Sequence, residues 1–170
     1  MLMMEKGTRI LTHSDIEQKV RRMSYQILEN NYDEKELHII GIRENGYLFA
    51  DKIYQELKSI SSLRLQVHAI AINKQNPAEQ LPVFDFNLKD LRGKTVLLVD
   101  DVGNTGRTLS YALRPLLEYM PRKIEIAVLV DRQHKLFPIR ADYVGLSLAT
   151  TMKEVVTVQM GNREDAAYLS

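Results

Sequence analysis

The chain has 170 residues, of which 45% are hydrophobic, so it can form one domain with a substantial buried core. Its formal net charge of +1 gives no global field that would attract nucleic acid or an anionic membrane. The absence of cysteine excludes disulfides and thiolate catalysis and is typical of a reducing compartment. There is no signal-peptide core and no apolar run of the roughly 20 residues that span a bilayer. We therefore expect a single cytoplasmic domain over residues 1–170 that does not contact a membrane.

The first elements predicted along the chain are helix, strand and helix. A helix is expected over residues 14–31, because Ser14 and Glu17 fit a capping box and apolar residues then recur at helical spacing. A short buried strand is expected over residues 38–42. A second helix is expected from Gly46 onward, where apolar residues again recur with helical period.

The middle of the chain continues this alternation. Residues 63–72 are predicted to form a strand, because apolar and polar residues alternate over its first part, 63–68, and residues 81–88 are expected to form a short strand or hairpin arm. Residues 95–99 predict a buried strand. An apolar-periodic helix follows it and is expected to stop at Pro121.

Three more strands are expected over residues 124–130, 143–146 and 155–160, and the polar tail 161–170 is expected to be mobile. Strands that alternate with helices predict an α/β fold with a mostly parallel, twisted sheet flanked by helices. A small hood over the site is expected from the N-terminal segment, from residues 142–151, or from both. Ligands of such sheets bind beyond the carboxyl ends of the strands, so the loops there should share one cleft.

The stretch from Val96 to Thr108 carries the strongest chemical signal. Four apolar residues lead to two carboxylates, Asp100 and Asp101, and then to a turn of glycine and hydroxyl residues that opens a helix. Free amides at a helix start attract phosphate, and paired carboxylates can accept hydrogen bonds from vicinal ribose hydroxyls. The combination predicts a sugar-phosphate site, because a purely structural strand-turn-helix rarely contains all of these residues.

Residues 96–108 resemble the phosphoribosyl-pyrophosphate loop of the type I phosphoribosyltransferases. The resemblance implies transfer of ribose 5-phosphate from phosphoribosyl pyrophosphate to a nucleobase, with release of pyrophosphate. It also implies that Asp100 and Asp101 are catalytic and hold the ribose, while the turn after them binds the 5′-phosphate. The residues implied for ribose 5-phosphate are Asp100, Asp101, Val102, Gly103, Asn104, Thr105, Gly106, Arg107 and Thr108.

A second loop follows the strand over residues 38–42 and is implied to bind the pyrophosphate, although many strand-to-helix loops have similar sequences. Lys74 is implied to help bind the pyrophosphate, because it is the only cation in residues 73–77, the stretch that corresponds to the family's mobile loop. Mg²⁺ is expected with the substrate, held by phosphate and ribose oxygens and water. Asp100 and Asp101 are expected to reach it only indirectly, with no direct protein ligand. The residues implied for pyrophosphate are Arg43, Glu44, Asn45, Gly46 and Lys74.

Residues 127–145 are similar to the uracil phosphoribosyltransferases that double as attenuation proteins of bacterial pyrimidine operons, and weaker similarity extends over residues 10–158. This branch implies a base pocket bordered by the end of the strand over residues 124–130. Taken alone, an adjacent acidic and basic residue would more often form a surface ion pair. The residues implied for the base pocket are Val130, Asp131, Arg132 and Arg140.

Asn104 favours uracil over a purine base. The 6-oxopurine branch of the family has an aspartate just before the Thr-Gly pair, and that aspartate is thought to handle the base proton. An amide cannot take this proton at neutral pH. The resemblance therefore predicts a phosphoribosyltransferase with uracil as the favoured base, acting as a homodimer or higher homo-oligomer.

Three departures from the uracil branch leave a binding module with little turnover as an alternative. Asn45 stands where the branch has a basic residue, and Lys74 is the single cation of the mobile-loop counterpart. Gly103 and Asn104 replace a Leu-Tyr pair. Such a protein would bind phosphoribosyl pyrophosphate through the acidic pair and the turn without releasing pyrophosphate.

An RNA-binding regulator of pyrimidine genes is the other alternative, since one face of the attenuation proteins binds messenger RNA. Positions that tend to hold an arginine pair there are Glu17 and Gln18 in this chain, and the net charge is near zero. Both observations make RNA a less favoured partner than substrate. The basic residues in question are Arg9, Lys19, Arg21 and Arg22.

Overall fold

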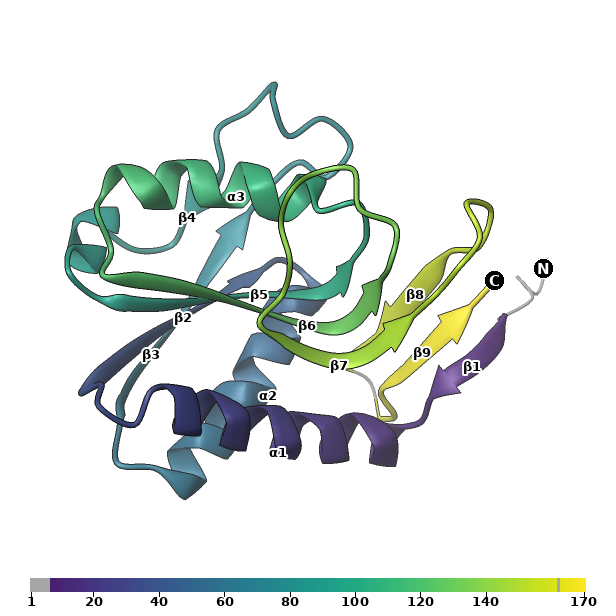
Figure 1. The fold of residues 1–170 in the computed structure, drawn as a ribbon, viewed down its shortest axis with the longest axis horizontal. Helices are drawn as coiled ribbons and strands as arrows, with labels where there is room; N and C mark the ends of the chain where they lie inside the picture. The colour runs from purple at the N-terminus through teal and green to yellow at the C-terminus, as the bar shows by residue number, and fades with distance from the viewer. Residues whose placement is uncertain (1–6, 162) are drawn as a thin grey trace.

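The computed structural model describes residues 7–161 and 163–170, and its centre is a six-stranded sheet (Figure 1). Its strands are β2 (Glu36–Ile42), β3 (Arg64–Ala71), β4 (Val83–Phe84), β5 (Thr95–Gly103), β6 (Lys123–Arg132) and β7 (Tyr143–Leu148). Their order across the sheet is β4-β3-β2-β5-β6-β7. Strands β3, β2, β5, β6 and β7 run parallel, and β4 pairs antiparallel at one edge. The predicted α/β fold with a mostly parallel sheet is confirmed.

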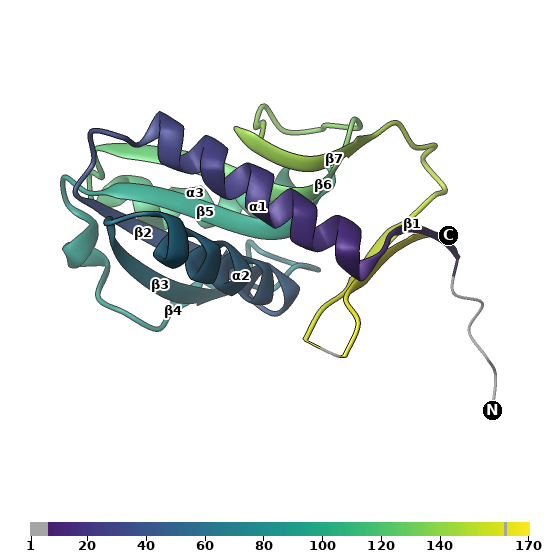
Figure 2. The same cartoon turned by 90° about the horizontal axis from the view of Figure 1, so that it is seen from below.

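Helices cover both faces of this sheet. The helices α1 (His13–Asn30) and α2 (Asn45–Ile60) pack on one face, and α3 (Arg107–Glu118) packs on the other (Figures 1 and 2). A short 3-10 turn, η1 (Leu88–Leu91), precedes β5. Because both faces are covered, residues 96–99 of β5 are all buried, as expected for a central parallel strand. In the described part of the chain, no helix has both the length and the apolar character that crossing a membrane requires.

Helix α1 begins differently from the prediction. Its N-cap is Thr12, whose Oγ1 accepts a hydrogen bond from the Asp15 amide at 3.1 Å, and the Asp15 carboxylate accepts one from the Thr12 amide at 2.8 Å. The predicted box of Ser14 and Glu17 is therefore wrong. Both windows fit the same four-residue pattern, but the Glu17 carboxylate is engaged by the Lys52 ammonium at 2.7 Å.

A second sheet lies beyond the carboxyl ends of the main strands and forms the hood (Figures 1 and 2). It consists of β1 (Thr8–Leu11), β9 (Ala166–Leu169) and β8 (Val156–Gln159), paired antiparallel in that order. The N-terminal contribution was expected, but residues 142–151 instead supply the edge strand β7 of the main sheet and the loop after it. The prediction of a mobile tail is wrong for residues 166–169, because β9 pairs with both β1 and β8.

Candidate functional site

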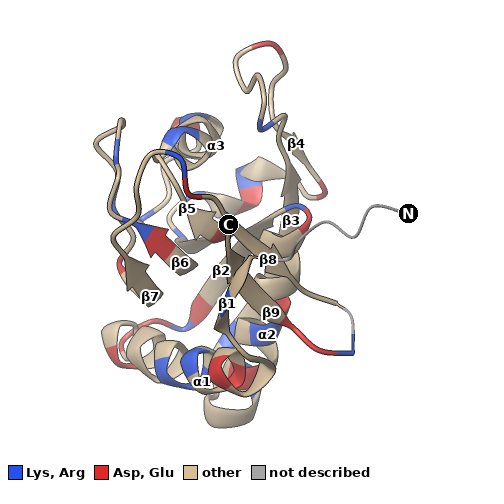
Figure 3. Cartoon of the chain, turned by 90° about the vertical axis from the view of Figure 1, so that its right-hand side faces the viewer, with Lys and Arg blue, Asp and Glu red and all other residues tan. Residues whose placement is uncertain are grey.

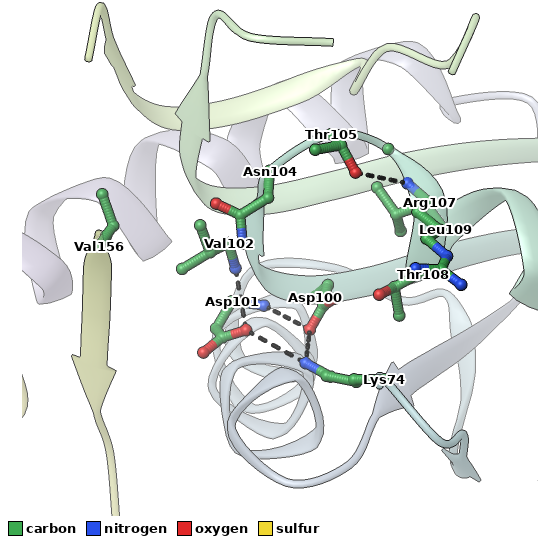
Figure 4. Close-up of a pocket in the computed structure, with 11 residues that line it drawn as sticks. Lys74, Asp100, Asp101, Val102, Asn104, Thr105, Arg107, Thr108, Leu109 and Val156 are labelled. Atoms are coloured by element: carbon green, nitrogen blue, oxygen red, sulfur yellow. Dashed lines mark hydrogen bonds and ion pairs between the residues drawn. The ribbon is translucent and has the colours of Figure 1, made fainter. Parts of the chain in front are cut away.

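A pocket of about 180 Å³ opens at the carboxyl end of β5, between the start of α3 and the hood (Figure 4). All the residues predicted to hold ribose 5-phosphate line it, with the exception of Gly103. Lys74 joins them from the loop after β3, and Val156 faces them from β8. The lining residues are Lys74, Asp100, Asp101, Val102, Asn104, Thr105, Gly106, Arg107, Thr108, Leu109 and Val156.

The acidic pair belongs to β5 itself, which continues four residues beyond the predicted end of the strand. Asp100 is only 2% exposed, whereas Asp101 lies at the pocket wall and is partly exposed. Helix α2 closes over Asp100, since a Cβ on Gly46 would lie 2.8 Å from Asp100 Oδ1. The backbone therefore places one carboxylate in the protein interior and its neighbour at the pocket surface.

The burial of Asp100 governs the electrostatics of the pair. Burial and then the negative charge of Asp101 raise the pKa of Asp100 to about 8. The Lys74 Nζ lies 3.2 Å from Asp100 Oδ1 and 3.7 Å from Asp101 Oδ1 (Figure 4). Burial disfavours the charged form of Lys74, but the two carboxylates outweigh it and raise the pKa of Lys74. The free site thus pairs a cation with two carboxyl groups, one buried and one partly exposed.

The turn after β5 has the geometry of an anion site. Gly106 has φ +86°, and a Cβ there would lie 2.4 Å from Ile139 Cγ2, so this position requires glycine. Helix α3 begins directly after it, at Arg107, and has no acidic residue in its first turn. The first amides of a helix have no intrahelical partner and carry partial positive charge. These amides start at the pocket wall, where a phosphate group can accept their hydrogen bonds.

Lys135 supports this turn through hydrogen bonds to its backbone carbonyls. Its Nζ donates to the carbonyl oxygens of Gly103 at 2.9 Å and Asn104 at 2.8 Å, and it pairs with Asp131 Oδ1 at 2.5 Å. The Thr105 carbonyl accepts bonds from the amides of residues 136 and 137. These hydrogen bonds anchor the backbone of the turn at three consecutive carbonyls. Asp131, predicted at the base pocket, acts in this support, and Lys135 was not predicted.

The other residues predicted for the base do not line the pocket. Val130 is fully buried in the core, and Arg140 is exposed. Arg132 is the residue that reaches a pocket wall, since its Nη1 donates to Asn104 Oδ1 at 3.2 Å. Its remaining nitrogens donate to Thr150 Oγ1 and to the Thr151 carbonyl. Arg132 thereby orients the Asn104 amide in the turn after β5, which we call the phosphate turn (residues 103–106) for the ligand expected there.

The loop 43–46, predicted to bind pyrophosphate, lies at the carboxyl end of β2 beside the acidic pair. Arg43 and Glu44 are exposed, and the peptide bond between them is cis. Asn45 donates its Nδ2 to the Val158 carbonyl of the hood at 2.8 Å, while Gly46 is buried against Asp100. The four residues border the acidic pair without lining the pocket, and Lys74 is the predicted pyrophosphate residue that does line it.

Two lining residues, Leu109 and Val156, were missed. Leu109 was assigned only to the apolar face of the predicted helix. Val156 comes from a strand that was predicted correctly, but no local signal shows that this strand turns back over the pocket. Figure 4 shows Val156 across the pocket from Thr108.

Comparison with known proteins places the chain in a family. Residues 6–161 match the family described as phosphoribosyl transferase domain. The chain is 35% identical to the bifunctional protein PyrR of Oceanobacillus iheyensis, over 98% of each chain. It is 34% identical to the bifunctional protein PyrR of Fusobacterium nucleatum, over 98% of this chain and 100% of the relative.

Solved structures show the same fold at lower identity. A hypoxanthine-guanine phosphoribosyltransferase from Bacillus anthracis superposes with a TM-score of 0.74 at 20% identity, covering 86% of this chain and 85% of that one. The hypoxanthine phosphoribosyltransferase of Trypanosoma cruzi gives 0.73 at 18% identity, over 83% and 81%. The family match, the full-length relatives and the shared fold agree, and the chain belongs to the phosphoribosyltransferase family.

Proposed function

We propose that the protein transfers ribose 5-phosphate from phosphoribosyl pyrophosphate to a nucleobase, with uracil as the favoured base. The observation that carries the proposal is the single pocket that joins a carboxyl pair, a helix start and a lysine. These are the groups needed for vicinal hydroxyls, a terminal phosphate and a diphosphate, respectively.

In this proposal Asp100 and Asp101 accept hydrogen bonds from the ribose hydroxyls, and the amides of residues 105–108 bind the 5′-phosphate. Lys74 and the loop 43–46 face the pyrophosphate. Transfer builds positive charge at the sugar carbon and negative charge on the departing pyrophosphate. The protein therefore acts by positioning the reactants and stabilising these charges, with no nucleophile of its own.

The acidic pair also fits Mg²⁺. Its donors are hard oxygens, and it already accommodates a cation, since the Lys74 ammonium lies within 3.7 Å of both carboxylates. Asp100 and Asp101 would hold the ion through water molecules. When bound, the ion would neutralise charge on the substrate's diphosphate.

Asn104 supports a pyrimidine base. It lines the pocket and its Oδ1 already accepts a bond from Arg132, so the group that it can offer a ligand is an amide N–H. That group donates and cannot remove a proton. The resemblance of residues 127–145 to the uracil-transferring branch points to the same base.

Pyrophosphate release tests the proposal. The purified protein is incubated with phosphoribosyl pyrophosphate, Mg²⁺ and one base at a time: uracil, orotate, xanthine, adenine or hypoxanthine. We expect release with uracil, and slower release from the Asp101→Asn variant at the same substrate concentration. Tight binding of phosphoribosyl pyrophosphate with no release for any base would instead support a binding module, and release with hypoxanthine alone would overturn the pyrimidine assignment.

Two basic residues of α1, Arg21 and Arg22, are exposed, but both also contact other groups of the protein. The Arg21 Nε lies 3.6 Å from the Glu56 carboxylate, and Arg22 donates to the carbonyls of Val144 and Gly145 at the edge of β7. Figure 3 shows acidic residues interspersed among the basic ones on this helix. We expect no salt-dependent retention of RNA in a filter-binding assay. Retention that falls steeply as the salt concentration rises would instead support the alternative of an RNA-binding regulator.

A further inference from the structure

The hood reaches the pocket through β8. Val156 lines the pocket, and Val158, two positions along the same strand, points to the same side. Both side chains are buried, at 7% and 4% exposure. Any shift of β8 relative to the main sheet therefore moves the pocket wall that faces the phosphate turn.

Asn45 connects this strand to the loop 43–46. It is the first residue of α2, and its Nδ2 donates to the Val158 carbonyl at 2.8 Å. The next residue, Gly46, packs against Asp100. One short side chain thus joins the hood to a backbone segment that lies directly beside the acidic pair.

A second connection holds the other end of the hood. The Lys52 ammonium lies 2.9 Å from Asp165 Oδ2 and 2.7 Å from Glu17 Oε1, and Asp165 also accepts a bond from the Gly161 amide. His13 completes this cluster at 3.4 Å from Asp165. The Lys52 ammonium lies between the two carboxylates, so the cluster is an ion-pair network that ties the β8–β9 connection to α1 and α2. No residue of this network lines the pocket.

We propose that Asn45 is a positioning residue that couples occupancy of the loop 43–46 to the position of β8. A ligand that fixes this loop fixes the Asn45 amide, and the 2.8 Å bond to Val158 then restrains β8 and with it Val156. The inference rests on the proposed role of the loop in binding pyrophosphate. The Asn45 side chain is already engaged by the Val158 carbonyl, so it acts through β8, while the rest of the loop faces the ligand.

Hydrogen exchange of residues 156–160 tests the coupling, with inorganic pyrophosphate and Mg²⁺ as the probe. Pyrophosphate should slow exchange there several-fold in the unaltered protein. The slowing should vanish in Asn45→Ala, and also in Asn45→Asp, which keeps the size of the side chain but cannot donate to the carbonyl. Lys52→Met is the matched control, because it cuts the other connection of the hood and should keep the slowing. Calorimetry on each variant measures pyrophosphate affinity separately, and thermal melts confirm that each is folded.

The possible results separate the coupling from the proposed function. If pyrophosphate binds every variant and still slows exchange in the Asn45 variants, the coupling is wrong and the proposed function stands. If Lys52→Met loses the slowing as well, the effect reports only the stability of the hood, which also overturns the coupling. If Asn45→Ala no longer binds pyrophosphate, Asn45 is a ligand and does not act through the hood. If the unaltered protein fails to bind pyrophosphate, the proposed role of the loop falls together with the coupling.

Discussion

The phosphate turn and the hood meet at one pocket but are built in opposite ways. The turn lies within a continuous segment, residues 100–108, and Lys135 binds its backbone carbonyls. The hood pairs β1 from one end of the chain with β9 from the other, so that Thr8 lies opposite Leu169. We infer that the turn supplies the affinity for the sugar phosphate, whereas the hood shapes the opposite wall. Variants in the two regions should therefore have separable effects.

The largest effect is expected for Gly106→Ala. The new Cβ would lie 2.4 Å from Ile139 Cγ2 at a φ of +86°, so the turn must move. Affinity for phosphoribosyl pyrophosphate should fall roughly 100-fold, the scale of losing several amide contacts to a charged group. The free energy of unfolding should fall by about 1–3 kcal/mol. Calorimetry and urea unfolding measure the two changes.

Gly93→Ala is the matched control for this variant. Gly93 also has a positive φ, +70°, but a Cβ there meets nothing within 4 Å, and the residue does not line the pocket. It should lose about 1–2 kcal/mol of stability to backbone strain while affinity stays unchanged. Equal affinity losses in both variants would mean that strain alone, and not the geometry of the turn, explains the first result.

The next largest effect is expected for Asp101→Asn. An amide oxygen replaces a carboxylate that is proposed to accept hydrogen bonds from the ribose, which should cost about 1.5–3 kcal/mol, or roughly 10- to 100-fold in affinity. Calorimetry with phosphoribosyl pyrophosphate measures the loss, and circular dichroism checks the fold. Unchanged affinity would refute the ribose assignment. Asp90→Asn, outside the pocket, should have no effect on binding.

Asp100 should make the stability of the turn region depend on pH. Its pKa is raised from 3.8 to about 8, chiefly by burial, so the folded protein binds the proton more tightly than the unfolded chain does. The resulting stabilisation is fully present below pH 3.8 and is lost as the pH rises toward about 8. Urea unfolding from about pH 4 to about pH 8 should therefore show a decline that is weaker in Asp100→Asn. Parallel curves for the two proteins would contradict the raised pKa.

The smallest effect on substrate affinity is expected in the hood. Lys52→Met removes the ammonium that pairs with Glu17 and with the buried carboxylate of Asp165, so unfolding should become easier by about 1–3 kcal/mol. Affinity for phosphoribosyl pyrophosphate should not change, because the network lies outside the pocket. A loss of affinity as large as that of Asp101→Asn would show that the two regions are not separable.

The contrast between a continuous turn and a hood built from distant segments also explains which features could be predicted from the sequence. The segment from β5 to α3 is local, so its strand, acidic pair, turn and helix can be identified from neighbouring residues alone. The strand β9 could not be identified in this way, because it is only four residues long and its pairing with β1 joins the two ends of the chain. The same limit applies to Val156, whose place in the pocket depends on where the hood sheet carries β8.

The candidate site divides in the same way. Asp100 and Asp101 were predicted together and both line the pocket, although the alternation along β5 leaves Asp100 buried and Asp101 partly exposed. The residues predicted for the base lie outside the pocket at β5: Val130 is buried in the core, and Asp131 pairs with Lys135. The alternation of side chains between the two faces of β6 does not show which of these residues would face the ligand, and neither does their identity.

The pairing of β1 with β9 has a consequence for how the molecule folds. The parallel strands pair segments that are closer along the chain than β1 and β9, whereas the hood must close a loop that contains nearly the whole core. Closing a longer loop costs more entropy, and contacts of high sequence separation form slowly. We expect the core to fold first and β1 to dock last, so that newly made chains pass through a state with a formed phosphate turn and no opposite wall.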